Sequence, residues 1–236
     1  MPTLYLIPTP LGEQEAPLWA IPAQTARLHN LTHFVVEAAK TARKHLKQLD
    51  LAHPIQSLSL SELNEHTPDA QVAALLAPLH AGHDMGLLSE AGCPAIADPG
   101  ARLVRLAHEA GFTVEPLIGP SSILLALMAS GSNGQRFAFH GYLPVDANER
   151  KKALQQLETR SRQEDSAQIF IETPYRNNAL LTTLLETLKP DTLLTAACDL
   201  TLSTQTIISR RTRDWPKPVP DLHKRPAIFV LYAGKS

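Results

Sequence analysis

The chain has 236 residues and 44% of them are hydrophobic, which is enough for one large domain or two small domains with real cores. Its formal net charge of −1 creates no overall basic field that would draw it to nucleic acid or anionic membranes. The two cysteines, Cys93 and Cys198, lie far apart and suggest no disulfide framework. No apolar run approaches the ~20 residues of a membrane span, and no signal peptide is evident. We therefore expect a cytoplasmic protein with no membrane partner.

Strand-like and helical patterns alternate through the first half of the chain. Stretches with helical periodicity separate five apolar, β-favouring runs, which are residues 4–7, 33–37, 55–60, 85–89 and 113–118. One helix is predicted over residues 99–111, where Gly111 stands at the position of a C-cap glycine. This alternation predicts a mainly parallel sheet covered by helices.

The second half of the chain is richer in strands. Two helical patterns, 146–162 and 175–188, lie among five predicted strands, which are residues 137–142, 168–172, 193–200, 204–211 and 227–233. Two of these strands follow each other with almost no gap, which implies an antiparallel pair and a mixed sheet. The segment SGSNGQR over 130–136 is the predicted boundary between two α/β domains, residues 1–133 and 134–236.

Turn-forming and polar residues follow each predicted strand of the first half. The segments are PTPLG (8–12), EAAK (37–40), SELNE (61–65), SEAGCPAIADPG (89–100) and GPSS (119–122). Open α/β sheets bind ligands outside the carboxyl ends of their strands, and proline and glycine allow rigid loops with close backbone approach. The sequence therefore predicts a ligand-binding rim made by five loops. In the alternative interpretation these are tight turns, with Asp98 and Ser121 or Ser122 as helix N-caps.

Several well-known motifs are missing. The sequence has no G-x-G-x-x-G after its first strand, no G-x-x-x-x-G-K-[ST] and no G-x-S-x-G, which disfavours ordinary dinucleotide, P-loop and α/β-hydrolase sites. His29 and His33 have a spacing of four residues but no H-E-x-x-H motif, so we predict no metal site.

Motifs in a fixed order carry a specific resemblance. They are LYLIPTPLG (4–12), SEAGCPAIADPG (89–100), GPSS (119–122), GYLP (141–144) and ETPYR (172–176). With them the chain resembles the tetrapyrrole-methylase superfamily of S-adenosylmethionine-dependent methyltransferases, and most of all the branch that methylates a ribose 2′-hydroxyl of a cytidine in 16S ribosomal RNA. The resemblance covers nearly the whole chain. It implies a homodimer, two α/β domains with S-adenosyl-L-methionine in the cleft between them, and ribosomal RNA or the small ribosomal subunit as partner.

The same resemblance implies a set of cofactor-binding residues from both domains. They are Pro10, Leu11, Gly92, Cys93, Ile96, Ser121, Ser122, Ala197 and Ala227. On this interpretation the loop over 89–100 holds the cofactor mainly through backbone groups and shape. Cys93 stands where the family often has threonine, so we interpret it as a small neutral lining residue and not as a nucleophile.

The catalytic residues are predicted from their position and from the chemistry. A sulfonium is an activated methyl donor, so the protein has to align the acceptor, exclude water and help a hydroxyl lose its proton. Glu37 and Glu65 each follow a predicted strand and are candidates for that role, and Arg43 matches a basic residue of the family. The alternative for both glutamates is a solvated cap at the end of a strand.

Departures from the family leave other functions open. The chain has Glu37-Ala38-Ala39-Lys40 where the branch has E-D-T-R, and Asp199-Leu200 where an arginine–glutamate pair is usual. Glu13 replaces an asparagine and Glu90 replaces an aspartate. The alternatives are a methyltransferase of a small tetrapyrrole-like or other metabolite, and a catalytically impaired sensor that binds the cofactor.

Three segments carry local positive charge, namely residues 40–47, 149–162 and 209–218. Such clusters bind phosphates with a strong dependence on salt, but the same pattern is typical of solvated helix faces. In the third segment, Trp215 could stack on a base or pack a loop onto the body of the protein.

Overall fold

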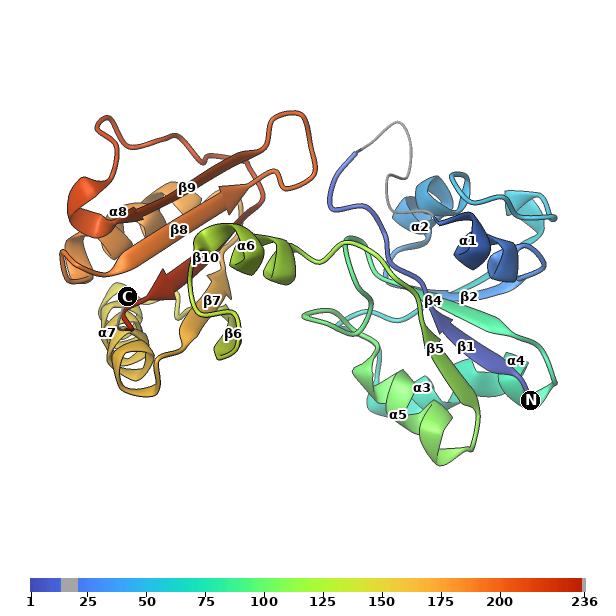
Figure 1. Cartoon of the computed structure of the whole chain (residues 1–236). Coiled ribbons are helices and arrows are strands. Elements are labelled where there is room, and N and C mark those ends of the chain that lie inside the picture. Colours follow the sequence, from blue (N-terminus) through green and yellow to red (C-terminus); the bar gives the residue numbers. More distant parts are fainter. Residues whose placement is uncertain (14–20, 235–236) are drawn as a thin grey trace. The chain divides into compact units, whose positions relative to one another are not determined.

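A computed structural model describes residues 1–13 and 21–234, and it divides the chain into two compact units, Met1–Ser121 and Ser122–Ser236 (Figure 1). The division falls earlier than the predicted boundary after residue 133. Helix α6 (Ser122–Ser130) packs against strands of the second sheet and therefore belongs to the second unit. Within the described residues, no helix is long and apolar enough to cross a membrane.

The first unit contains a five-stranded sheet in which every strand pair is parallel. Its strand order is β3-β2-β4-β1-β5, and the strands are β1 (Thr3–Leu6), β2 (His33–Val36), β3 (Ser59–Glu62), β4 (Met85–Leu88) and β5 (Thr113–Pro116). The predicted parallel α/β architecture is thus confirmed. The strand predicted over 55–60 is displaced, because Ile55–Ser57 forms a 3-10 turn (η1) in which the Ser57 hydroxyl bonds back to the Pro54 carbonyl.

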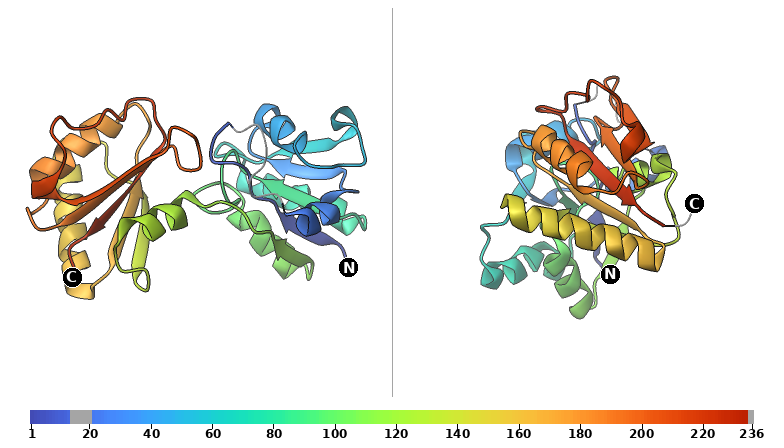
Figure 2. Two further views of the ribbon diagram at one scale, coloured as in Figure 1. Left: turned by 45° about the horizontal axis from the view of Figure 1, so that its top comes forward. Right: turned by 90° about the vertical axis from the view of Figure 1, so that its left-hand side faces the viewer.

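Helices cover both faces of this sheet (Figures 1 and 2). Neighbouring residues of a strand point to opposite faces, so Val35 packs with one set of helices while Phe34 and Val36 pack with the other. The helices on the Phe34 face are α1 (Pro22–Leu28) and α2 (Ala39–Leu46). The Val35 face packs against α3 (Asp69–Val72), η2 (Ala73–Leu76), α4 (Ala77–His80) and α5 (Ala101–Glu109). Both faces are buried, as the apolar strand runs require.

Glycines flank helix α5 on both sides. Gly100 is its N-cap residue with φ of +134°, and no side chain caps the helix there. The proposed capping role of Asp98 is therefore wrong. At the other end Gly111 has φ of +80° and its N–H donates to the His108 carbonyl at 3.0 Å, which confirms the predicted C-terminal glycine.

The second unit contains a five-stranded mixed sheet of order β6-β7-β10-β8-β9. The β6–β7 pair is parallel and the remaining three pairs are antiparallel, so the prediction of a mixed sheet is confirmed. The strands are β6 (Phe137–Tyr142), β7 (Ala167–Ile171), β8 (Leu193–Cys198), β9 (Thr206–Arg211) and β10 (Ala227–Tyr232). Helices α7 (Ala147–Glu164) and α8 (Asn177–Thr187) lie close to the predicted ranges, and the Asp146 side chain caps α7 by accepting two backbone N–H bonds.

Helices lie on both faces of the second sheet as well. Leu154 of α7 and Leu180 of α8 share a buried cluster with Phe170 and Phe229 of the strands. Helix α6 lies on the opposite face, where its Ser130 carbonyl accepts a hydrogen bond from the Ser209 hydroxyl at 2.6 Å.

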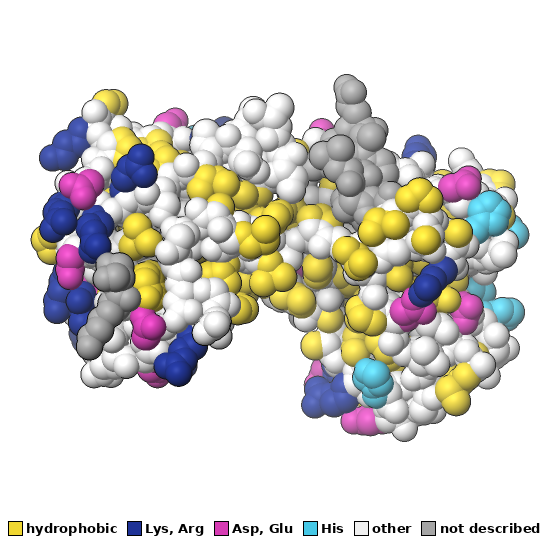
Figure 3. Space-filling model, viewed as in Figure 1, with side chains coloured by type: hydrophobic (Ala, Val, Ile, Leu, Met, Phe, Trp, Pro, Cys, Tyr) yellow, Lys and Arg dark blue, Asp and Glu magenta, His cyan; other side chains and the backbone are white. Residues whose placement is uncertain are grey.

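The basic segment 209–218 is anchored by its tryptophan. Trp215 follows the 3-10 turn η3 (Thr212–Asp214), is only 5% exposed and belongs to the buried cluster on the α7–α8 face. Packing is thus confirmed for Trp215, and stacking on a base is excluded by its burial. On the face drawn in Figure 3, Lys and Arg side chains gather on the second unit.

Candidate functional site

Three loops of the first unit meet at the carboxyl edge of its sheet. The loop after β1 and the loop after β4 are joined by two backbone hydrogen bonds between Thr9 and Gly92, at 2.9 and 3.1 Å. The loop after β5 joins them because the Cys93 Sγ lies 3.4 Å from the Pro120 carbonyl oxygen, to which it donates. These contacts bring together three of the five segments of the predicted rim, which are 8–12, 89–100 and 119–122.

Two glycines allow the close approach of these loops. Gly92 has φ of +79°, and a Cβ atom added there would lie 3.3 Å from Leu11 Cδ2 and 3.6 Å from the Pro120 oxygen. A Cβ added at Gly119 would overlap the ring of Pro8. The absence of a side chain at these two positions therefore lets the three loops pack closely.

The structure brings together the predicted cofactor residues of the first unit. Pro10, Leu11, Gly92 and Cys93 lie in the joined loops, and Ile96 lies further along the loop after β4 with 52% of its surface exposed. Burial raises the pKa of the Cys93 thiol, so the thiol stays protonated and neutral. This protonation state fits the predicted lining role and not a nucleophile.

Ser121 is the last residue of the first unit, and Ser122 is the first residue of α6 in the second unit. The other predicted cofactor residues of the second unit, Ala197 and Ala227, lie near each other on paired strands. Ala197 pairs with Ile228, one residue from Ala227, where β8 ends and β10 begins.

Asp199, a departure from the family, lies at this same edge and is 8% exposed. Its carboxylate accepts a hydrogen bond from Arg225 at 2.8 Å. Arg225 also donates to the Thr204 carbonyl and the Thr206 hydroxyl, so this ion pair fixes the loop after β8 against the start of β10.

A group of carboxylates lies at the end of β2 and in the loop after β4. The Glu37 carboxylate accepts a hydrogen bond from the Glu90 N–H at 3.1 Å, and burial raises the pKa of Glu37. Burial, and then the negative charge of Glu37, raises the pKa of Asp98 from 3.8 to about 6. Two carboxyl groups with raised pKa values at the edge of a ligand-binding loop are candidates for proton transfer. Sequence reasoning found Glu37 but assigned Asp98 only a capping role.

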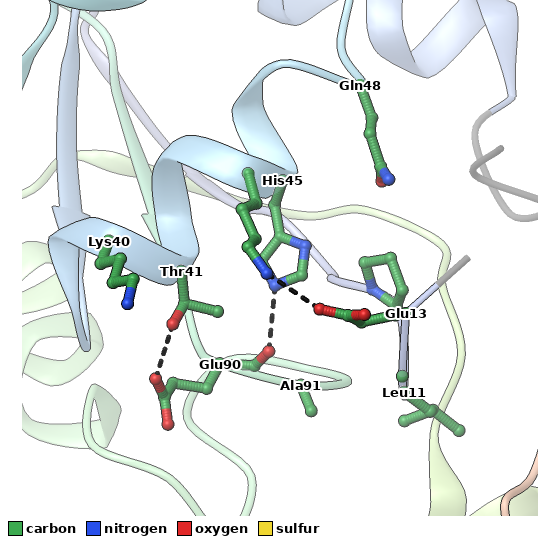
Figure 4. Close-up of a pocket in the computed structure, with 11 residues that line it drawn as sticks. Leu11, Glu13, Lys40, Thr41, His45, Gln48, Glu90 and Ala91 are labelled. Atoms are coloured by element: carbon green, nitrogen blue, oxygen red, sulfur yellow. Dashed lines mark hydrogen bonds and ion pairs between the residues drawn. The ribbon is translucent and has the colours of Figure 1, made fainter. Parts of the chain in front are cut away.

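Helix α2 and the loops after β1 and β4 line an open pocket of about 790 Å³ (Figure 4). Thr41 donates to the Glu90 carboxylate at 2.9 Å, His45 Nε2 lies 3.1 Å from the Glu90 carbonyl, and Lys44 donates to Glu13 at 2.8 Å. Glu90, which differs from the aspartate typical of the family, thus fixes its loop onto α2. Burial lowers the pKa of His45, which favours the neutral imidazole.

The other two predicted catalytic residues are not drawn into this group. Glu65 is 84% exposed at its side chain, and its nearest ionic contact is His66 at 3.6 Å. Arg43 is exposed on α2 and does not line the pocket. Glu62 lies three residues before Glu65, and its carboxylate accepts a hydrogen bond from the Ala39 N–H at the start of α2. A capping role, which was the alternative considered for Glu65, is therefore seen at Glu62.

The two sheets and the loops at the strand ends define an α/β protein with a ligand rim of closely packed loops. Residues 25–214 match the family of Tetrapyrrole (Corrin/Porphyrin) Methylases. The chain belongs to this family and is a methyltransferase.

Relatives with known names cover almost the whole chain. A protein of Escherichia coli O157:H7 named "Ribosomal RNA small subunit methyltransferase I" is 33% identical over 236 residues, which is 99% of this chain and 78% of that protein. A protein of Synechocystis sp. with the same name is 32% identical over 92% of this chain and 76% of its own length.

Solved structures share the fold at lower identity. The methyltransferase CobJ has a TM-score of 0.62 at 19% identity over 98% of this chain and 92% of its own. The cobalt precorrin-4 methyltransferase CbiF has a TM-score of 0.59 at 14% identity over 98% of this chain and 94% of its own.

Proposed function

We propose that this protein transfers a methyl group from S-adenosyl-L-methionine to the ribose 2′-hydroxyl of a cytidine in 16S ribosomal RNA. The protein acts on the small ribosomal subunit in the cytoplasm and works as a homodimer in this proposal. The observation that carries the choice of substrate is the 33% identity over 99% of the chain to a protein whose name specifies small-subunit ribosomal RNA. Tetrapyrrole-modifying enzymes share the fold at only 14 to 19% identity.

The rim of the first unit fits the proposed cofactor. Its loops are packed closely, since a Cβ at Gly119 would overlap the Pro8 ring and a Cβ at Gly92 would lie 3.3 Å from Leu11 Cδ2. Its side chains there are small or neutral, since Leu11 is apolar and the Cys93 thiol is protonated. When bound, S-adenosylmethionine supplies an activated methyl group on a sulfonium. Pro10, Leu11, Gly92, Cys93, Ile96, Ser121 and Ser122 would hold it from this side, and Ala197 and Ala227 from the second unit.

The carboxylates have the task of removing the proton from the acceptor hydroxyl. Glu37 and Asp98 are half-buried, and both pKa values are raised, which brings Asp98 closer to neutral pH where a general base works best. We assign the proton-accepting role to this pair. Glu65 lies close enough to raise the pKa of Glu37 slightly, and its exposure gives it a minor role.

The other residues of the site orient the loops. Thr41 bonds to the Glu90 carboxylate and His45 to the Glu90 carbonyl, and these contacts keep the Glu90 N–H directed at the Glu37 carboxylate. The positive charge of Arg43 on the exposed side of α2 is available for RNA phosphates and has no role in proton transfer in this proposal.

The test is methyl transfer from labelled S-adenosylmethionine to isolated small ribosomal subunits and, separately, to a reduced tetrapyrrole. We expect label in the subunit RNA and a fall of at least about 100-fold for Asp98→Asn, because a general base contributes about 10²–10⁴ to the rate. Glu65→Gln is the matched control and is expected to keep most of the activity.

Each alternative function has its own result in this experiment. Label in the tetrapyrrole and none in RNA would assign the protein to small-metabolite chemistry. Cofactor binding with no label in either acceptor would define a sensor.

A further inference from the structure

The two units carry opposite net charges. The first unit has seven Lys and Arg against twelve Asp and Glu, a net charge of −5, whereas the second has fifteen against eleven, a net charge of +4. The net charge of −1 for the whole chain is therefore the sum of two large opposite charges. Such asymmetry between two halves of a chain is typical of nucleic-acid contact by the basic half.

Three acids of the second unit contribute little to its outer surface. Glu158, Glu172 and Asp199 are 5%, 4% and 8% exposed. Glu172 and Asp199 are paired with Arg176 and Arg225 at 2.7 and 2.8 Å. Among the described residues of the second unit, exposed Lys and Arg therefore outnumber exposed Asp and Glu, and Lys and Arg side chains gather on its face in Figure 3.

Buried Glu158 instead fixes the turn 189–192 from inside the protein. Its carboxylate accepts hydrogen bonds from the Lys189 N–H at 2.8 Å and from the Thr192 hydroxyl. The turn is also bonded to η3, because the Thr212 hydroxyl donates to the Lys189 carbonyl at 2.6 Å and the Arg213 N–H donates to the Pro190 carbonyl at 3.2 Å. Two loops and α7 thus form one rigid surface.

Cations from four elements, α7, the turn 189–192, β9 and η3, gather on this surface. Arg162 of α7 donates to the Asp191 carboxylate at 3.4 Å, and Arg211 of β9 donates to the Asp191 carbonyl at 2.6 Å. Lys189 is exposed beside them in the turn, and Arg213 is 58% exposed at its side chain. We call these four residues, Arg162, Lys189, Arg211 and Arg213, the Asp191 platform.

The anions near the platform are fewer. Arg162 holds the pKa of Asp191 below its usual range by hydrogen bonding, and Lys189 adds to this effect, so Asp191 is charged at neutral pH. Asp214 lies 3.5 Å from Arg213. Four cations against these two exposed carboxylates and the buried carboxylate of Glu158 leave the platform positive. The fixed loops allow it to bind an anion without losing much chain entropy.

We propose that the Asp191 platform binds phosphates of the RNA substrate at a distance from the methylation site. Asp191 lies two residues before β8 and six residues before Ala197, which is at most about 20 Å at ~3.3 Å per residue. That distance corresponds to roughly six stacked nucleotides at 3.4 Å each. This inference rests on the proposed function and extends it, since it makes the enzyme prefer a long, structured RNA over a short fragment.

The experiment measures binding and methylation separately. The affinity of a labelled fragment of 16S ribosomal RNA is measured by fluorescence anisotropy at several salt concentrations for the wild type and for Lys189→Gln/Arg213→Gln. Both side chains are exposed at the surface. The control Lys151→Gln/Lys152→Gln removes the same charge from exposed positions of α7, more than two turns away from Arg162. Methyl transfer to small subunits is measured on the same proteins.

We expect the platform variant to bind RNA about 5- to 20-fold more weakly than the control. The slope of log K against log salt should fall by about 1.4, because each lost phosphate contact on a single strand accounts for about 0.7. The KM for subunits should rise while binding of S-adenosylmethionine stays unchanged. The inference is overturned if the platform variant and the control have equal slopes and affinities.

The results separate the inference from the proposed function. If the wild type methylates subunits and the two variants bind RNA equally well, the proposed function is supported and the platform is refuted. If the platform variant loses RNA affinity but the wild type transfers no methyl group, the platform is supported and the proposed function is refuted. An RNA affinity of the wild type that does not depend on salt contradicts the platform directly.

Discussion

Gly119→Ala tests whether the convergence of the three loops creates the cofactor site. A Cβ atom at this position would overlap the Cβ and Cγ atoms of Pro8. The proline ring cannot rotate away, so the loops after β1 and β5 have to separate until the carbons reach ordinary contact at about 3.5–4.0 Å. Overpacking of this kind costs about 1–3 kcal/mol.

The strain should appear in cofactor affinity, because both displaced loops carry predicted cofactor residues. If the full cost is expressed in binding, the Kd for S-adenosylmethionine rises about 5-fold to 140-fold, at 1.4 kcal/mol for each factor of ten. Isothermal titration calorimetry with S-adenosylmethionine or its demethylated product gives the Kd. Thermal unfolding of the same protein shows whether the variant is folded.

Gly134→Ala is the matched control, since an added Cβ at that exposed position meets nothing within 4 Å. It should keep the wild-type Kd. The reasoning is refuted if Gly119→Ala is folded and binds the cofactor as tightly as this control.

Two further predictions concern charged groups. The pKa of Asp98 rises on folding from 3.8 to about 6, so the folded state holds this proton more tightly and the stabilisation is complete below pH 4 and lost as the pH rises through 6. Asp98→Asn should therefore raise the Tm above pH 7 by about 2–4 °C, which corresponds to about 1 kcal/mol after allowance for solvent screening. The same substitution should leave the Tm unchanged at pH 4, and equal shifts of Tm at both pH values would contradict this prediction. Removing Asp199 leaves Arg225 without its carboxylate, so Asp199→Ala should lower the free energy of unfolding in urea by about 3 kcal/mol. Glu164→Gln, which breaks the exposed Arg160–Glu164 pair, should cost less than about 0.5 kcal/mol, and similar losses for the two variants would refute the role of burial.

The architecture of both units followed from local patterns, but the division between them did not. Strands buried on both faces read as apolar runs, so the parallel sheet could be predicted. Helix α6 has the sequence SILLALMAS, which is apolar on nearly every side. Such a helix has no polar face to indicate which sheet it packs against, so the sequence alone predicts the boundary in the glycine-containing segment after it.

The loops of the candidate site could be predicted from the residues that shape the backbone, whereas the properties that depend on burial could not. Glycines and prolines after strands indicated the loops that meet around Gly92 and Gly119. The sequence DPG before α5 favours a cap for Asp98, whereas the raised pKa comes from burial and from Glu37, which is distant in sequence. A glutamate at a strand end can equally be exposed, as Glu65 is. Contacts between segments far apart in the chain decide such cases.

The chemical form of the product tests the central claim most directly. Small-subunit RNA is methylated with labelled S-adenosylmethionine and hydrolysed in alkali, which cleaves each phosphodiester through its neighbouring free 2′-hydroxyl. Methylation of a ribose 2′-hydroxyl predicts label in an alkali-resistant dinucleotide that begins with cytidine. Label in a mononucleotide, as base methylation would give, or no label in RNA would contradict the account.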